Sequence, residues 1–92
     1  MTANSKEMEV ERAGIRFQLS AEQGDDGKWR YNVYRLLDDG NHHEHGPVEY
    51  TTVHVQQPNG HFIRGLTDEE CLEDGLLQAD NWVLENVHKW LS

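Results

Sequence analysis

The sequence predicts an α+β domain in which an antiparallel meander of three or four strands packs against one long C-terminal helix. Apolar and polar residues alternate with period two in several short stretches before residue 65. Asp-Gly and Asn-Gly pairs separate these stretches, and a capping signal precedes a final segment with helical spacing. Residues 13–92 are expected to form this single domain. Residues 1–12 are charged and poor in apolar side chains, so we expect a flexible or short helical N-terminal segment.

The first two strands are predicted on either side of a tight turn. Ile15, Phe17 and Leu19 alternate with polar residues, which places one apolar row on a single face of a strand. The Asp-Gly pair at residues 26–27 marks the turn, because glycine tolerates the positive φ that tight hairpins require. Residues 28–37 then form the second strand. Its alternation slips out of phase in the second half, which indicates a bulge or a bend.

A second pair of strands is predicted after a polar loop. Residues 38–47 are rich in Gly, Asp, Asn and His, a composition typical of a loop. Residues 48–57 are rich in Val, Thr and Tyr and are expected to form the third strand. The Pro-Asn-Gly sequence at residues 58–60 is a hairpin signal, so a short fourth strand at about residues 61–64 should pair back onto the third.

A capping box predicts where the C-terminal helix begins. Thr67 is expected to accept from the backbone N–H of Glu70, while the Glu70 side chain reaches back to the backbone of Thr67. The helix should therefore span residues 68–91. Apolar residues recur along it at spacings of three and four, which gives one buried face. They are Leu72, Leu76, Ala79, Val83, Val87 and Trp90.

The charge of the chain restricts its partners. The 92 residues include 17 acidic and 8 basic side chains, for a formal net charge of −9. The resulting field repels phosphate groups, so general nucleic-acid binding is disfavoured. A basic protein surface is attracted by the same field. We therefore expect the partner to be another protein, with a basic one favoured.

Several classes of function are disfavoured by missing signals. The phosphate-binding glycine loop, the GxSxG motif and the HExxH motif are absent, so we expect a non-enzymatic protein without a cofactor. The single cysteine, Cys71, fits a reducing compartment. No apolar run reaches the length of a membrane span or of a signal segment, and a cytoplasmic chain without a membrane part is expected.

The outer side of the predicted helix is a candidate partner-binding surface. At 100° per residue, the apolar arc of the helix is wider than one face of a sheet usually covers. Leu77 and Leu84 flank the core-facing row on one side, with Glu73 and Asp80 beside them, and Trp82 flanks it on the other. These five residues contact another chain, or loops of the domain wrap the helix and bury them. Both a monomer and a homodimer fit the pattern.

The histidine-rich segment suggests an alternative function in metal binding. His42, His43 and His45 lie within four residues of one another, and imidazole is a good ligand for zinc, nickel or copper. A metal ion needs three or four such groups that converge at fixed distances. The competing interpretation is a solvated loop that happens to be rich in histidine.

The C-terminal third of the chain resembles HicB-like antitoxin domains. In that family a strand hairpin leads into a glycine, a Ser or Thr cap, a glutamate and a small residue at the start of an amphipathic helix. The matching residues are Gly65, Thr67, Glu70 and Cys71, followed by the helix to Trp90, within about residues 60–91. The resemblance implies a non-catalytic acidic domain that masks a basic ribonuclease partner.

Overall fold

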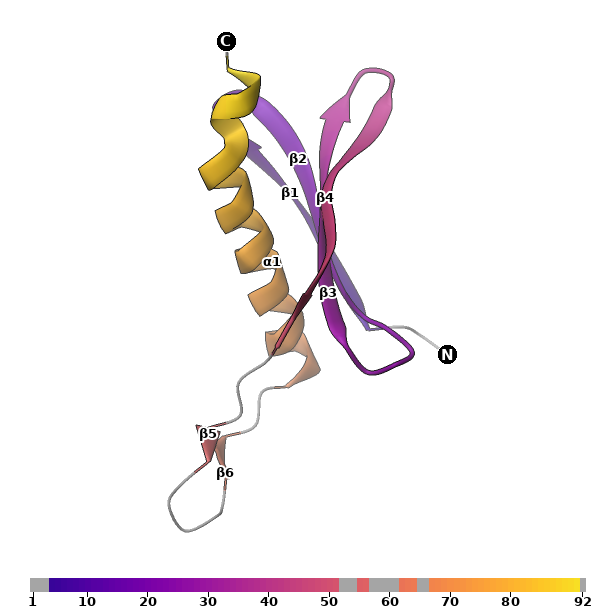
Figure 1. Cartoon of the computed structure of the whole chain (residues 1–92), viewed down its shortest axis with the longest axis vertical. Coiled ribbons are helices and arrows are strands. Elements are labelled where there is room, and N and C mark those ends of the chain that lie inside the picture. Colours follow the sequence, from indigo (N-terminus) through magenta and orange to yellow (C-terminus); the bar gives the residue numbers. More distant parts are fainter. Residues whose placement is uncertain (1–3, 52–54, 57–61, 65–66, 92) are drawn as a thin grey trace.

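The computed structural model describes residues 4–51, 55–56, 62–64 and 67–91. It confirms the α+β class, because a four-stranded antiparallel sheet in the order β1-β2-β3-β4 packs against one C-terminal helix (Figure 1). A separate two-stranded sheet pairs β5 with β6. The elements are β1 (Ser5–Arg12), β2 (Ile15–Gln23), β3 (Trp29–Leu37), β4 (Gly40–Tyr50), β5 (Val55–Gln56), β6 (Phe62–Arg64), α1 (Asp68–Asn86) and the 3₁₀ helix η1 (Val87–Trp90).

The prediction of a flexible or helical N-terminal segment is wrong for residues 5–12, which form the edge strand β1. This strand pairs antiparallel with β2 along its whole length. Only Met8 and Val10 are apolar in it, yet Val10 is buried opposite Phe17 because β2 and α1 complete its surroundings. The connecting turn at Ala13-Gly14 has positive φ at both residues, 53° and 82°, without the Asp-Gly or Asn-Gly pair that usually signals such a turn.

The β2–β3 hairpin confirms the first two predicted strands. The Asp-Gly pair at residues 26–27 lies in the turn between them, as expected. Phe17 and Leu19, from the predicted apolar row, are completely buried against the helix. The period-two pattern was informative here because one face of β2 contacts the core while the other faces solvent.

The turn itself contains an ion pair that makes stability depend on pH. The Arg30 guanidinium lies 2.7 Å from the Asp26 carboxylate, and the backbone N–H of Lys28 donates to it at 3.1 Å. These bonds lower the pKa of Asp26 from 3.8 to about 2. The ionised carboxylate therefore favours the folded state above about pH 4, and this contribution is lost as the pH falls from about 4 to about 2.

We predict that Asp26→Asn flattens the fall in stability between about pH 4 and pH 2. The asparagine side chain has no proton to take up, so the pH-dependent difference between folded and unfolded chains disappears at this site. Urea unfolding of both proteins across this range measures the effect. Curves that stay parallel at every pH would show that Asp26 does not couple protonation to folding.

The prediction of a polar loop at residues 38–47 is wrong, because most of these residues belong to β4. The chain turns at residues 38–39, and the strand ends at Tyr50 instead of running from residue 48 to 57. As an edge strand, β4 is mostly polar and has no period-two apolar pattern. Composition alone therefore made it resemble a loop.

The prediction of a bulge or a bend in residues 28–37 is wrong in its place, because the register between β3 and β4 shifts but the extra residues lie on β4. The register with β3 passes from Tyr31 opposite Val48 to Val33 opposite His45, and then to Tyr34 opposite His43. Each step adds one residue to β4.

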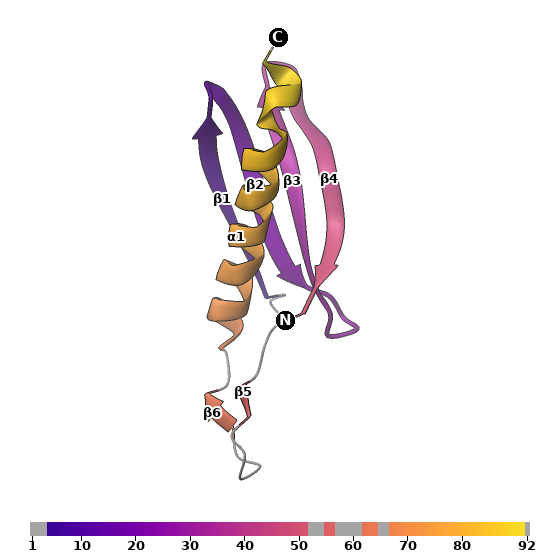
Figure 2. The same ribbon diagram turned by 60° about the vertical axis from the view of Figure 1, so that its left-hand side comes forward.

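A short hairpin follows β4 in the chain. Residues 55–56 pair with residues 62–64 in a separate sheet, beyond the N-terminal end of α1 (Figures 1 and 2). The predicted fourth strand at residues 61–64 thus pairs with part of the predicted third strand, although outside the main sheet. The expected turn at residues 58–60 lies outside the described residues.

The C-terminal helix begins at the predicted capping box. The backbone N–H of Glu70 donates to Thr67 Oγ1 at 3.1 Å, and the backbone N–H of Thr67 donates to the Glu70 carboxylate at 3.2 Å. The helix α1 ends at Asn86, and its last predicted turns form η1. Its core-facing row lies across β2 and β3 (Figure 2). The buried members of this row are Leu72, Leu76, Ala79 and Val83.

We predict that Thr67→Ala lowers the free energy of unfolding by about 1 kcal/mol, because the first turn of α1 loses its side-chain acceptor. The urea midpoint measures this. Thr67→Ser keeps the hydroxyl and should retain most of the stability, so it serves as the control. Equal midpoints for the alanine variant and the parent chain would mean that the capping box contributes nothing.

Candidate functional site

An apolar groove of about 400 Å³ opens between β1 and α1. We call it the β1–α1 groove. Its lining residues are Lys6, Met8, Glu73, Leu76, Leu77 and Asp80. Met8 is 42% exposed and Leu77 is 59% exposed, so two large apolar side chains face solvent across the groove. Neighbouring exposed apolar side chains in a groove make this surface a candidate for binding.

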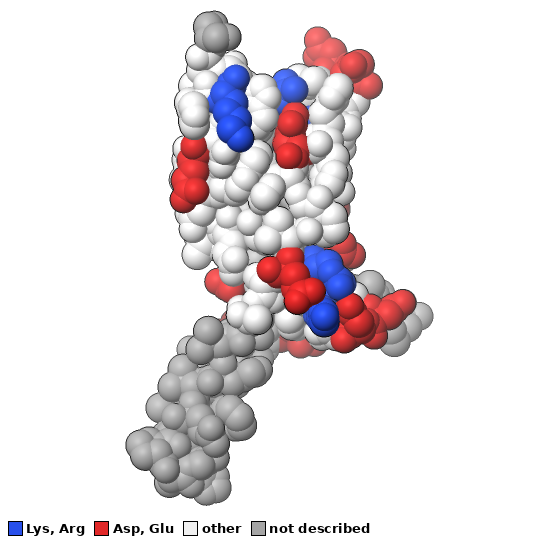
Figure 3. Space-filling model, in the orientation of Figure 1, with Lys and Arg blue, Asp and Glu red and all other residues white. Residues whose placement is uncertain are grey.

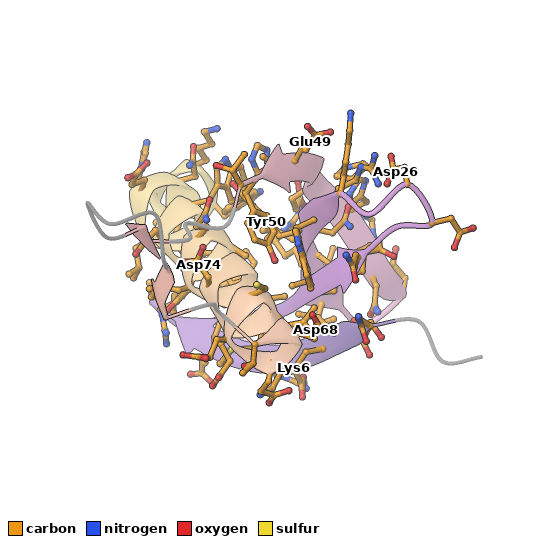
Figure 4. The ribbon with its side chains drawn as sticks, turned by 90° about the horizontal axis from the view of Figure 1, so that it is seen from below. Lys6, Asp26, Glu49, Tyr50, Asp68 and Asp74 are labelled. Carbon is orange, nitrogen blue, oxygen red and sulfur yellow. The ribbon has the colours of Figure 1, made fainter. Side chains whose placement is uncertain are left out.

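Ion pairs link β1 to α1 on both sides of Met8. The ammonium of Lys6 bonds to Glu69 and lies 3.9 Å from Glu73, near the first turns of the helix. Figure 4 shows Lys6 beside the start of α1, close to Asp68. The guanidinium of Arg12 bonds to both carboxylate oxygens of Asp80, at 2.7 and 3.1 Å.

These pairs hold the strand against the helix at two separate points. The Arg12–Asp80 pair is partly buried, with side-chain exposures of 33% and 20%, and has two-point geometry that fixes its orientation. Lys6 keeps its positive charge firmly, because the hydrogen bond to Glu69 raises its pKa. The groove therefore has ion pairs that fix it at both ends and apolar side chains between them.

The structure brings three of the five predicted partner-binding residues into this groove. Glu73, Leu77 and Asp80 line it, and Leu84 stands two turns further along the same side of α1 with 54% exposure. The Asp80 carboxylate already forms an ion pair with Arg12, so its charge is largely neutralised within the domain.

Trp82 lies on the opposite flank of α1 and does not join the groove. Its ring stacks on His45 of β4, with centroids 4.4 Å apart and planes 8° apart. The Lys89 ammonium lies 5.6 Å from the same indole ring. Burial lowers the pKa of His45, with smaller contributions from His43 and Lys89. Trp82 therefore helps to fasten β4 to the helix.

The three predicted metal-ligating histidines do not converge. His43 Nε2 lies 2.9 Å from Asn32 Oδ1 on the face of the sheet away from α1, whereas His45 stacks on Trp82 on the helix side. His42 bonds to Asp39 at the hairpin. Across residues 4–51, 55–56, 62–64 and 67–91, no group of three or more His, Cys, Asp or Glu side chains is placed to hold a metal ion. The geometry of these histidines does not favour the alternative function.

The surface formed by α1 and β4 is a weaker candidate than the groove. Figure 3 shows that the middle of this face is largely free of charged side chains, which gather toward its upper and lower parts. A shallower hollow of about 240 Å³ lies there, lined by Tyr31, Gln78, Asn81, Trp82 and Glu85. None of these is among the strongly exposed large apolar residues of the described chain, which are Met8, Leu37, Leu77, Leu84 and Leu91.

Sequence reasoning missed the residues that β1 contributes to the groove, namely Lys6 and Met8. Both fall in the segment that was expected to be flexible. A signal was present, because Met8 and Val10 alternate with charged residues just before a strand of the same period. The alternation was short, and the Ala-Gly turn after it is not a recognised hairpin pair.

Neither the search for membrane-spanning helices nor comparison with known proteins assigns a function to this chain. Within the described part of the chain, no helix combines the length and the apolar character needed to cross a membrane. The resemblance to HicB-like antitoxin domains stays a prediction. Comparison of the chain with protein-family models, with curated proteins and with solved structures found no significant match.

Proposed function

We propose that this chain is a non-enzymatic acidic module that binds another protein, and that the β1–α1 groove receives the partner. The observation that carries the proposal is the groove itself, where exposed Met8 and Leu77 lie beside an edge of β1 with which no other described strand pairs. Burial of both side chains in a complex contributes roughly 25 cal/mol for each Å² of apolar surface removed from water.

The charge of the chain favours a basic partner. Its net charge is −9, and Glu73 at the rim of the groove is 58% exposed. Acidic groups at the rim of an apolar contact mainly accelerate association with a cationic surface and discriminate against acidic ones. The resemblance of residues 60–91 to HicB-like antitoxin domains suggests one specific form of this function, in which the module masks a basic ribonuclease in the cytoplasm.

The test compares matched surface variants in a binding experiment. We expect a partner that co-purifies with the tagged parent chain to be lost when Leu77 and Leu84 are both changed to Ser. The control is Leu37→Ser, which alters another exposed leucine on the β3–β4 hairpin, away from β1. This variant should retain the partner.

The fold of each variant is checked by its urea midpoint before binding is interpreted. Because Leu77 and Leu84 are more than half exposed, the double variant should unfold close to the parent midpoint. A partner retained equally by the folded double variant would show that the groove side of α1 is not the binding surface.

A further inference from the structure

The outer edge of β1 offers backbone groups that no described strand occupies. Among the described residues β1 pairs only with β2, and it contains neither proline nor bulge. Antiparallel pairing uses the N–H and C=O groups of alternate residues. The Gln23 N–H donates to the Asn4 carbonyl oxygen at 2.9 Å, and this bond shows which alternate residues of β1 exchange backbone hydrogen bonds with β2. The backbone groups of the even-numbered β1 residues therefore face β2, and those of Glu7, Glu9 and Glu11 face the open edge. The Glu11 carbonyl oxygen already accepts from the Arg12 guanidinium at 3.0 Å, so the edge offers a new strand the N–H and C=O groups of Glu7 and Glu9 and the N–H of Glu11.

The side chains of β1 form two rows of different chemistry. The even row points toward α1 and includes Met8, which lines the groove. The odd row, on the other face of the sheet, contains three glutamates. Within the described part of the chain, the single ion pair of this row joins Arg16 to Glu9, at 2.6 Å. A strand placed beside β1 would meet apolar surface on one face and excess negative charge on the other.

We infer that the partner binds as a strand added antiparallel to β1, through an extended segment in which basic and apolar residues alternate. Its backbone pairs with the N–H and C=O groups of Glu7 and Glu9 and with the N–H of Glu11. Its apolar side chains enter the β1–α1 groove against Met8 and Leu77, and its basic side chains lie beside the glutamates. This inference rests on the proposed function, since it specifies how the same groove is filled.

A second copy of the chain does not fit this edge. In an antiparallel pair, directly opposed residues lie on the same face, so β1 against another β1 places glutamates opposite glutamates throughout its central part. The opposite edge of the sheet is also unsuited, because β4 carries two register shifts and Pro47. Charge thus protects β1 against self-association while leaving it open to a cationic strand.

Synthetic peptides test this mode of binding. The probe has eight residues, the length of β1, with lysine and valine alternating. A peptide of the same composition with its lysines and valines in two blocks controls for charge. In the added strand, the lysine amides face β1 and the valine amides face away. N-methylation of the lysine amides should therefore weaken binding at least about tenfold, whereas N-methylation of the valine amides should have a much smaller effect.

Amide hydrogen exchange locates the contact on the protein. With the alternating peptide bound, the amides of Glu7, Glu9 and Glu11 should gain protection. The amides of Met8 and Val10 already face β2 and should change little. The double variant Met8→Ser and Leu77→Ser should weaken peptide binding, while Leu37→Ser should not.

If the peptide with its lysines and valines in two blocks bound as tightly as the alternating peptide, attraction by charge alone would replace strand addition. The same would follow if N-methylation of the lysine amides and of the valine amides weakened binding equally. Protection of the three glutamate amides without peptide, rising with protein concentration, would overturn strand addition in favour of a second copy. A natural partner that requires Leu77 and Leu84 but leaves these amides unprotected would also overturn strand addition while supporting the proposed function. A natural partner indifferent to both leucines would instead contradict the proposed function.

Discussion

The substitution Val83→Ser is expected to lower the free energy of unfolding by about 3 kcal/mol, a larger loss than the helix cap or any exposed leucine should produce. Val83 is completely buried on the core-facing row of α1, among the residues of β2 and β3. The change removes two methyl groups, leaves a cavity and buries a hydroxyl group. A small domain with one core has little reserve to absorb that loss.

Leu84→Ser is the matched control, since it changes the adjacent residue on the exposed side of the same helix. Leu84 is 54% exposed, so its removal should shift stability by less than about 0.5 kcal/mol. Urea unfolding of both variants gives the comparison. Similar losses for the two would mean that Leu84 is covered in solution, and that its side of α1 is not available to a partner.

Gly75→Ala should destabilise the chain by about 2 kcal/mol, against the usual preference of helices for alanine. An alanine Cβ at this position would lie 2.6 Å from Tyr50 Cζ and 2.8 Å from Tyr50 Cε1. The ring cannot easily move away, because its hydroxyl donates to the Cys71 carbonyl oxygen at 2.8 Å in a buried hydrogen bond. Burial also raises the pKa of Tyr50 to about 12.

The measurement is urea unfolding of Gly75→Ala in the parent chain and in a Tyr50→Phe background. The phenol oxygen is the atom nearest to the added methyl group, so its removal should reduce the cost of the alanine. If alanine instead stabilises the parent chain by about 1 kcal/mol, helix propensity outweighs the contact and α1 has moved away from β4.

Val83 and Gly75 belong to the contacts that position the groove. Val83 holds α1 on the sheet, and Gly75 lets the end of β4 approach the start of the helix (Figure 4). The ion pairs of Lys6 and Arg12 then fix β1 beside the same helix. A partner that enters the groove therefore meets a surface whose two sides are fixed by the core and by salt bridges, which reduces the ordering needed on binding.

Local sequence patterns determined the parts of the fold whose signals come from neighbouring residues. The capping box at Thr67 and Glu70 depends on bonds within one helical turn, and it was predicted with both partners. The alternation of Phe17 and Leu19 reflects one buried face of a strand. The angular position of Leu77 and Leu84 beside the core-facing row was also predicted, because helical geometry is set by the local backbone. Their exposure was left open by the sequence and was decided by the placement of the other elements.

Tertiary contacts determined that two polar segments of the chain form strands. Residues 5–12 and 40–50 are strands because β2 and β3 supply their backbone partners, although the apolar row of the first is limited to Met8 and Val10 and the second is mostly polar. Each pairs with its hairpin neighbour, from Arg12 opposite Ile15 in one hairpin and from Leu37 opposite Gly40 in the other, but their own side-chain patterns are too short or too polar to specify a strand. The groove depends on that pairing, since only the placement of Met8 on β1 beside Leu77 on α1 creates it.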